Sequence, residues 1–273
     1  MGCTTGAKIL NNGHNVIIFK NKDFKTPGHS DTICLEHTHA FGVRGLDLGT
    51  QKVAGFSIGV NQDGLAVVNS NVLSTSDPPY DILTERIVLG ARTVEEAIKI
   101  CEKEIQAQNY QWCNMVIATP KQLAGIELKS SDLAITRSSD YVVKTNHHLI
   151  LRSTEEILRF NQNKGPRDIK NSEIRYINAE KMLKNASSVN EIFSLLKFHQ
   201  EEASICRHGQ NTVIDVGYTT VYSYVITIHM EKHPQIYFDV VKGPSCMNSV
   251  TRFKLEFPLD DSVKEQFYQR YPL

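Results

Sequence analysis

The chain contains 273 residues, and its 30 lysines and arginines balance its 30 aspartates and glutamates, so the formal net charge at pH 7 is zero. A chain without excess positive charge is not expected to hold nucleic acid or an anionic membrane by bulk electrostatics. Hydrophobic residues make up 41% and charged residues 22% of the sequence, which excludes disordered and collagen-like proteins. We expect one domain over residues 1–273, long enough to bury a core without disulfides.

The first third of the sequence predicts two β-hairpins. Asn11-Asn12-Gly13 and the segment from Asn61 to Gly64 each separate two apolar runs. In each turn a glycine provides the positive φ that tight hairpin turns need. The strands expected in this part are 8–10, 15–19, 33–36, 53–60 and 65–69.

Helical patterns come next. Residues 81–89 follow two prolines, and Thr93 with Glu96 forms a capping box at the start of a helix that reaches about residue 106. The apolar residues of this second helix recur at three- and four-residue spacing, at Val94, Ala97, Ile98, Cys101 and Ile105. Cys101 is therefore expected in the core.

The remaining two thirds alternate between groups of strands and groups of helices. The expected strands are 114–118, 123–129, 133–137, 141–144, 212–216, 219–230 and 235–241. The expected helices are 154–160, 172–183 and 188–198, and residues 161–171 are the most loop-like stretch. Runs of like elements predict antiparallel sheets with helices packed on their outer faces, an α+β class.

The sequence indicates a cytoplasmic protein without metal or cofactor. No apolar run approaches the roughly 18 residues of a membrane span, and the start lacks the basic and apolar blocks of a signal peptide. The six cysteines have neither CxxC nor zinc-finger spacing, which is typical of reduced thiols. His37 and His39 would share a strand face, but no further ligands follow at a convincing spacing.

Cys3 is the residue that carries the chemical hypothesis. If Met1 and Gly2 are removed, the α-amine of Cys3, with a pKa of about 8, lies within one side chain of the sulfur. This arrangement suits amide chemistry, in which a thiolate attacks a carbonyl and forms an acyl-enzyme. Two alternatives are an inert cysteine and lipidation after Met-Gly, although Gly6 stands where a myristoylation signal has Ser or Thr.

Five segments of the chain form an ordered set that spans residues 2–207. They are Gly2-Cys3-Thr4-Thr5, Asn21 to Phe24, Gly64 to Asn71, Thr145-Asn146-His147 and Ser204 to Arg207. Together they resemble the acyl-coenzyme A:6-aminopenicillanic acid acyltransferase family of N-terminal-nucleophile (Ntn) hydrolases, which is related to penicillin V acylase and bile-salt hydrolase. No single segment is specific, but their order is.

The resemblance implies a four-layer αββα sandwich of two antiparallel sheets, and self-cleavage between Gly2 and Cys3. Cys3 would then be the nucleophile and its freed amine the base. Asp23 would hold this amine, and Arg207 would stabilise the thiolate, because a nearby guanidinium lowers the pKa of a thiol. Asn146 would donate its side-chain amide to the oxyanion, with the backbone N–H near Asn71 as the second donor.

We therefore expect an amide hydrolase or an acyltransferase whose partner is a small N-acyl amide substrate. Hydrolysis or transfer, the acyl group and a homo-oligomeric state are left open. The alternative is a non-catalytic small-molecule-binding protein on the same scaffold, with Met-Gly retained. The chain departs from the bile-salt hydrolase branch at Lys20, where that branch usually has an arginine three residues before the aspartate.

Overall fold

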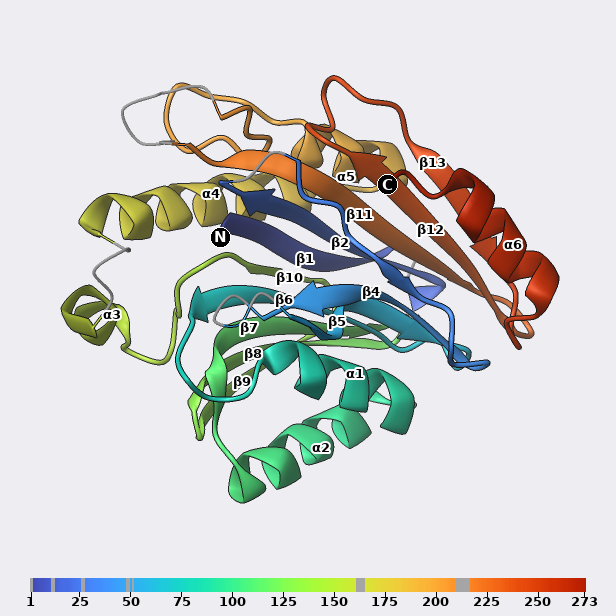
Figure 1. The fold of residues 1–273 in the computed structure, drawn as a ribbon, viewed down its shortest axis with the longest axis horizontal. Helices are drawn as coiled ribbons and strands as arrows, with labels where there is room; N and C mark the ends of the chain where they lie inside the picture. The colour runs from blue at the N-terminus through green and yellow to red at the C-terminus, as the bar shows by residue number, and fades with distance from the viewer. Residues whose placement is uncertain are drawn as a thin grey trace.

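Two antiparallel sheets form the centre of the computed structural model, which describes all residues except 1, 11–12, 26–27, 48–49, 51, 161–164 and 210–216 (Figure 1). In order, the first sheet contains β10 (Tyr141–Lys144), β1 (Gly2–Leu10), β2 (Asn15–Phe24), β11 (Thr219–Met230), β12 (Pro234–Lys242) and β13 (Thr251–Leu255). The second contains β3 (Ile33–Cys34), β4 (Ala40–Leu46), β5 (Val53–Asn61), β6 (Ala66–Leu73), β7 (Tyr110–Thr119), β8 (Gln122–Ser130) and β9 (Asp132–Ser138).

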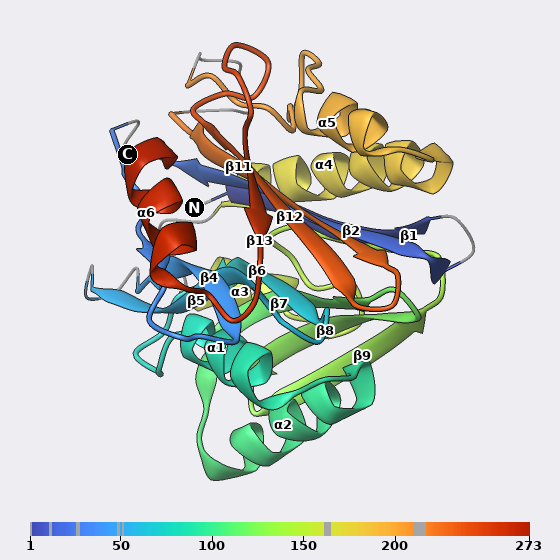
Figure 2. The ribbon, with the colours of Figure 1, turned by 90° about the vertical axis from the view of Figure 1, so that its right-hand side faces the viewer.

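Helices cover the outer faces of both sheets, so that the fold has four layers (Figure 2). The helices are α1 (Tyr80–Gly90), α2 (Val94–Ala107), α3 (Thr154–Phe160), α4 (Pro166–Asn185), α5 (Val189–Leu196) and α6 (Asp261–Arg270). α1 and α2 lie on the second sheet, and α4 and α5 lie on the first. Among the described residues, no helix combines the length and hydropathy that crossing a bilayer requires.

The first part of β2 is apolar at successive positions because both of its faces are covered. Ile18 packs into the core between the sheets, whereas Ile17 and Phe19 pack against α4 and α5. Successive side chains of a strand point to opposite faces, so a strand covered on both sides needs apolar residues at every position. The strand changes character after Phe19, and its last part, Lys20 to Asp23, is polar yet fully buried.

The structure confirms the α+β class and the two antiparallel sheets, and it corrects several element boundaries. The loop expected at 161–171 is wrong from residue 166 onward, because α4 begins at Pro166, whose missing N–H costs nothing in a first helical turn. The strand expected at 212–216 lies outside the described residues. β4, β13 and α6 were not predicted from the sequence.

Two glycines allow the start of α1 to lie directly against the second sheet. A Cβ atom at Gly45 would come within 2.2 Å of the Asp81 carboxyl carbon, and one at Gly55 would come within 2.1 Å of the Asp81 backbone carbonyl. Gly55 also has a φ of 53°, in the left-handed region that favours glycine. These contacts fix Asp81 beneath the polar end of β2.

We expect Gly55→Ala to lower the free energy of unfolding by about 2–4 kcal/mol, because it combines left-handed strain with a backbone clash. Gly28→Ala is the matched control, since a Cβ there meets no atom within 4 Å. It should change stability by less than about 0.5 kcal/mol. Urea unfolding of both variants measures this difference, and equal midpoints would contradict the role given to Gly55.

Candidate active site

Cys3 lies in the second position of β1 and is fully buried. The antiparallel register places Cys3 opposite Lys22 and Thr5 opposite Lys20. Residues that face each other in such a pair project from the same side of the sheet, so Cys3 and Lys20 share one face. Lys20 reaches Ser57 of the second sheet, which shows that this face lies between the two sheets.

Asn146 holds the backbone of Cys3. The Cys3 N–H donates to Asn146 Oδ1 at 2.8 Å, and Asn146 Nδ2 donates to the carbonyl of Asn71 at 2.7 Å. The Asn146 N–H donates in turn to Ser172 Oγ of α4 at 2.7 Å. Asn146 therefore links β1 to β6 through its carboxamide and reaches α4 through its backbone N–H.

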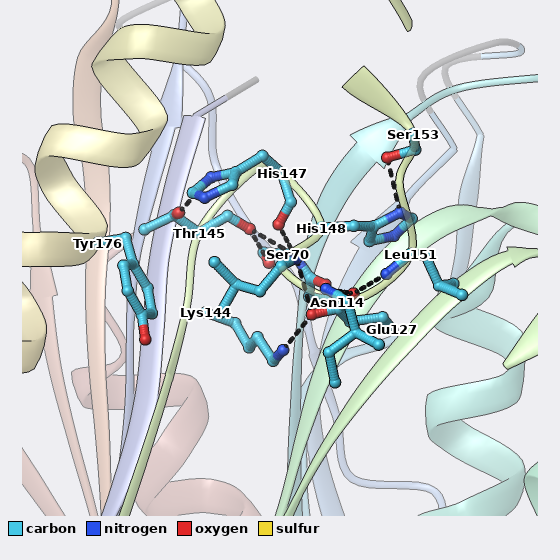
Figure 3. Close-up of polar contacts among 12 residues, drawn as sticks. Ser70, Asn114, Glu127, Lys144, Thr145, His147, His148, Leu151, Ser153 and Tyr176 are labelled. Carbon is cyan, nitrogen blue, oxygen red and sulfur yellow. Dashed lines mark hydrogen bonds and ion pairs between the residues drawn. The ribbon is translucent and has the colours of Figure 1, made fainter. Parts of the chain in front are cut away.

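Buried side chains fix the loop that carries Asn146 (Figure 3). Asn114 Nδ2 donates to the carbonyls of Thr145 at 3.0 Å and His147 at 2.9 Å, and Ser70 Oγ donates to the Thr145 carbonyl at 2.6 Å. His147 Nδ1 lies 2.9 Å from Ser172 Oγ. The backbone on both sides of Asn146 is thus anchored to β6, β7 and α4.

Glu127 anchors the continuation of the same loop. Its carboxylate pairs with Lys144 at 2.6 Å and accepts the backbone N–H groups of three consecutive residues, Leu149, Ile150 and Leu151 (Figure 3). Burial raises the pKa of Glu127, but Lys144 and these hydrogen bonds outweigh burial and leave the pKa below its usual value. Lys144 and the N–H groups of the loop therefore keep the Glu127 carboxylate ionised.

Arg175 of α4 is a buried contact of the site that the sequence analysis missed. Its guanidinium donates to the Cys3 carbonyl at 2.5 Å, to Thr4 Oγ1 at 3.0 Å and to Asn146 Oδ1 at 2.8 Å. Arg175 thus contacts both residues of the Cys3–Asn146 hydrogen bond, Cys3 through its carbonyl and Asn146 through Oδ1. The helix was predicted over 172–183, but its apolar spacing gives no signal that one arginine points inward.

Asp23 and Arg207 lie together on one side of Gly2, where a side chain at that position would project. β1–β2 pairing places Gly2 opposite Asp23, whose Oδ1 accepts from Thr220 Oγ1 at 2.8 Å. Arg207 Nη1 lies 3.7 Å from Asp23 Oδ2. A Cβ at Gly2 would come within 2.6 Å of Arg207 Nη1 and 3.0 Å of Asp23 Oδ2, so a glycine fits this space closely.

Lys20 supplies the positive charge that acts most strongly on the thiol. Burial raises the pKa of Cys3, and the Lys20 ammonium opposes this increase. Lys20 Nζ is held by Ser57 Oγ at 2.6 Å and by the carbonyl and side-chain oxygens of Asn69 at 2.8 and 3.1 Å. The residue that departs from the bile-salt hydrolase pattern therefore faces the candidate nucleophile.

The buried carboxyl group of Asp81 continues this chain of contacts. Asn69 Nδ2 donates to Asp81 Oδ1 at 3.0 Å, so Asn69 connects Lys20 with Asp81. Burial raises the pKa of Asp81 to about 7, although Lys20 lowers it in part. Neither Asn69 nor Asp81 was singled out in the sequence, because their positions follow from long-range packing.

The structure brings all five predicted site residues to the first residues of β1. Asn146 contacts Cys3 directly, Asn71 contacts Asn146, and the pair of Asp23 and Arg207 lies next to Gly2. Two details differ from the expected roles. Asn146 uses one of its amide hydrogens on the Asn71 carbonyl, and the Arg207 guanidinium lies by Asp23 and 4.7 Å from the ring centre of Tyr218. The catalytic roles of the five residues remain predictions.

Comparisons with known proteins identify a family and a similar fold. Residues 10–232, most of the chain, match the family model of acyl-coenzyme A:6-aminopenicillanic acid acyl-transferase. No curated protein sequence matches the chain. The fold is similar to a conjugated bile acid hydrolase from Clostridium perfringens, solved as a cysteine-to-alanine mutant, with a TM-score of 0.54 and 12% identity over 93% of this chain and 97% of that one. An arginine-to-leucine variant of that hydrolase gives a TM-score of 0.52 and 13% identity over 94% and 98%.

We expect Lys20→Met to raise the pKa of the Cys3 thiol, because the variant removes a positive charge that stabilises the thiolate. The measurement is the pH dependence of Cys3 alkylation, followed by peptide mass mapping so that the other cysteines do not interfere. The midpoint should move to higher pH. Lys20→Arg keeps the charge and serves as the control, and coinciding midpoints in all three proteins would refute the assignment.

Proposed function

The chain belongs to the acyl-coenzyme A:6-aminopenicillanic acid acyl-transferase family, and we propose that it is a cysteine Ntn hydrolase that cleaves small linear amides, or transfers their acyl group, through an acyl-enzyme on Cys3. The observation that carries the proposal is the contact of the Cys3 backbone nitrogen with Asn146, beside the pair of Asp23 and Arg207. A nitrogen that is to serve as a base requires such a defined polar environment.

Maturation begins with an attack by Cys3 Sγ on the carbonyl carbon of Gly2. The thiol proton passes to the Cys3 nitrogen, the Gly2–Cys3 C–N bond breaks, and the Met-Gly segment is held as a thioester. Water then hydrolyses the thioester, which releases the Met-Gly carboxylate, the free thiol and a free α-amine. The close approach of Asp23 and Arg207 to Gly2, together with the bond from Cys3 N–H to Asn146, supports this step, because these contacts hold the scissile bond in one place.

Turnover uses the new amine as the base. The amine accepts the thiol proton, the thiolate attacks the substrate carbonyl, and the proton then leaves with the amine product. Asp23, opposite the position that Gly2 vacates, orients the ammonium form, and Asn146 holds the nitrogen from the other side. The second amide hydrogen of Asn146 is suited to the oxyanion. The positive charge of Lys20 favours the thiolate.

The identity of the second acceptor decides between hydrolysis and transfer. Water that attacks the thioester gives a carboxylic acid, and an amine gives a new amide. The family name refers to acyl transfer, whereas the similar solved structures are hydrolases of conjugated bile acids. A panel of N-acyl amino acids, penicillin V, glycine-conjugated bile salts and β-alanyl amines, assayed for primary amine release, covers these substrate classes.

We expect intact mass spectrometry of the purified chain to show loss of both Met1 and Gly2, together with amine release from at least one member of the panel. Cys3→Ala should retain Gly2 and release no amine, because it has no sulfur to attack the Gly2 carbonyl. Loss of Gly2 from Cys3→Ala would mean that another protease removes it. A chain that keeps Gly2 and binds a panel compound without turnover would favour the non-catalytic alternative.

Asn146→Ala should reduce kcat by about 10²–10³-fold if its amide stabilises the oxyanion. The variant also loses its bond to the Cys3 nitrogen, so it is assayed after its processing state has been checked by mass. The exposed Asn185 at the end of α4 provides the control, and Asn185→Ala should retain the parent kcat. A processed Asn146→Ala protein within threefold of the parent would remove Asn146 from the mechanism.

A further inference from the structure

Two histidines and two cysteines form a second cluster, which includes both sequence neighbours of Arg207. One ligand atom from each of His199, Cys206, His208 and Cys246 lies within 4.8 Å of all the others. His199 Nε2 and His208 Nε2 are 2.7 Å apart, and the Cys206 and Cys246 sulfurs are 3.6 Å apart. His208 Nε2 also lies 3.1 Å from Cys246 Sγ and 3.9 Å from Cys206 Sγ.

The four residues come from three separate parts of the fold. His199 follows the end of α5, Cys206 and His208 precede β11, and Cys246 lies in the connection between β12 and β13. Neighbouring hydrogen bonds hold these parts together: the Cys206 N–H donates to the Phe198 carbonyl at 3.1 Å, and Ser245 Oγ donates to the Leu196 carbonyl at 2.8 Å. The spacing along the chain resembles no zinc-finger motif, so the sequence analysis expected no metal.

The distances match those of a tetrahedral zinc site. Zinc takes Cys₂His₂ ligands with Zn–S of about 2.3 Å and Zn–N of about 2.0–2.1 Å. In a tetrahedron these lengths separate two sulfurs by about 3.8 Å, sulfur and nitrogen by about 3.6 Å, and two nitrogens by about 3.4 Å. The sulfur pair and the two sulfur–nitrogen pairs of His208 lie within about 0.5 Å of these separations. The nitrogens of His199 and His208 need to part by about 0.7 Å.

A disulfide between Cys206 and Cys246 explains less of this geometry. Its sulfurs would have to approach from 3.6 Å to about 2.05 Å. It would also leave the approach of His208 Nε2 to both sulfurs unexplained. Four convergent donors of the types that zinc prefers, from three segments, are explained together by one ion.

We propose that His199, Cys206, His208 and Cys246 bind one zinc ion in a closed structural site. Two thiolates balance the charge of Zn²⁺, and two neutral imidazoles complete the coordination. Binding displaces the thiol protons into solvent and changes no oxidation state. The ion joins the end of α5 to the segments that enter β11 and β13.

Arg207 stands between two of these ligands in the sequence, so zinc binding would also affect the position of Arg207. The Arg207 N–H donates to Thr220 Oγ1 at 2.9 Å, and the same hydroxyl donates to Asp23 Oδ1 at 2.8 Å. Zinc at Cys206 and His208 therefore fixes the backbone that carries Arg207 to Asp23. This effect on the reaction rests on the proposed function, whereas zinc binding itself does not.

We expect the full-length protein, expressed in zinc-supplemented medium, to contain about one zinc per chain by elemental mass spectrometry. Cys246→Ser and His199→Asn should each lose most of it, and both residues are exposed, so folding should survive. The exposed His233→Asn is the matched control and should retain full zinc content. Cys3→Ala should also retain it, which separates failure of this proposal from failure of the proposed function.

Cobalt substitution gives an independent measurement. Co²⁺ added to chelator-stripped protein should produce the visible absorption of tetrahedral cobalt and a near-ultraviolet thiolate-to-cobalt band, both lost in Cys246→Ser. Zinc-free protein that binds neither ion would overturn the proposal. A Cys206–Cys246 disulfide found by non-reducing peptide mapping of freshly isolated protein would also overturn it, as would normal zinc content in both ligand variants.

Discussion

The pairing of β1 with β2 is the constraint on which the candidate site depends. It sets Cys3 on the same face as Lys20 and sets Gly2 opposite Asp23. Burying so many polar groups is unfavourable unless each finds a partner, and here partners come from both sheets, from α4 and from the 145–151 loop. The site is therefore a property of the assembled layers, because no single element contains it.

Many of the buried polar side chains around the candidate site hydrogen-bond to backbone groups. Asn114, Glu127 and Arg175 touch carbonyl or N–H groups of the segments that carry Cys3 and Asn146. Buried networks of this kind restrict a segment to one conformation when all members are satisfied. A rigid support is what a reaction that depends on tenths of an ångström requires. Under the proposed zinc coordination, the four-ligand cluster would restrain the backbone of Arg207 in the same way.

Local sequence signals predicted the fold well where the physical cause is local. The 61–64 turn was placed correctly, and Thr93 accepts the expected N–H bond from Glu96 at the start of α2, at 3.2 Å. β4 was missed because its glycines weaken the strand signal, and α6 was missed because few of its residues are buried. The five site residues came from a family resemblance in ordered segments. Contacts between distant segments bring Lys20, Asp81 and Arg175 to the candidate site, and periodicity and spacing do not reveal such contacts.

The buried position of Gly2 has a consequence for the order of folding and maturation. The backbone of Gly2 and Cys3 gains its partners only after two strands, a helix and a loop have come together. Under the proposed chemistry, an incompletely folded chain keeps its nucleophile capped by an amide and stays inert. Removal of Met1 and Gly2 would thus occur only in chains that have folded, without a chaperone or an activating protease.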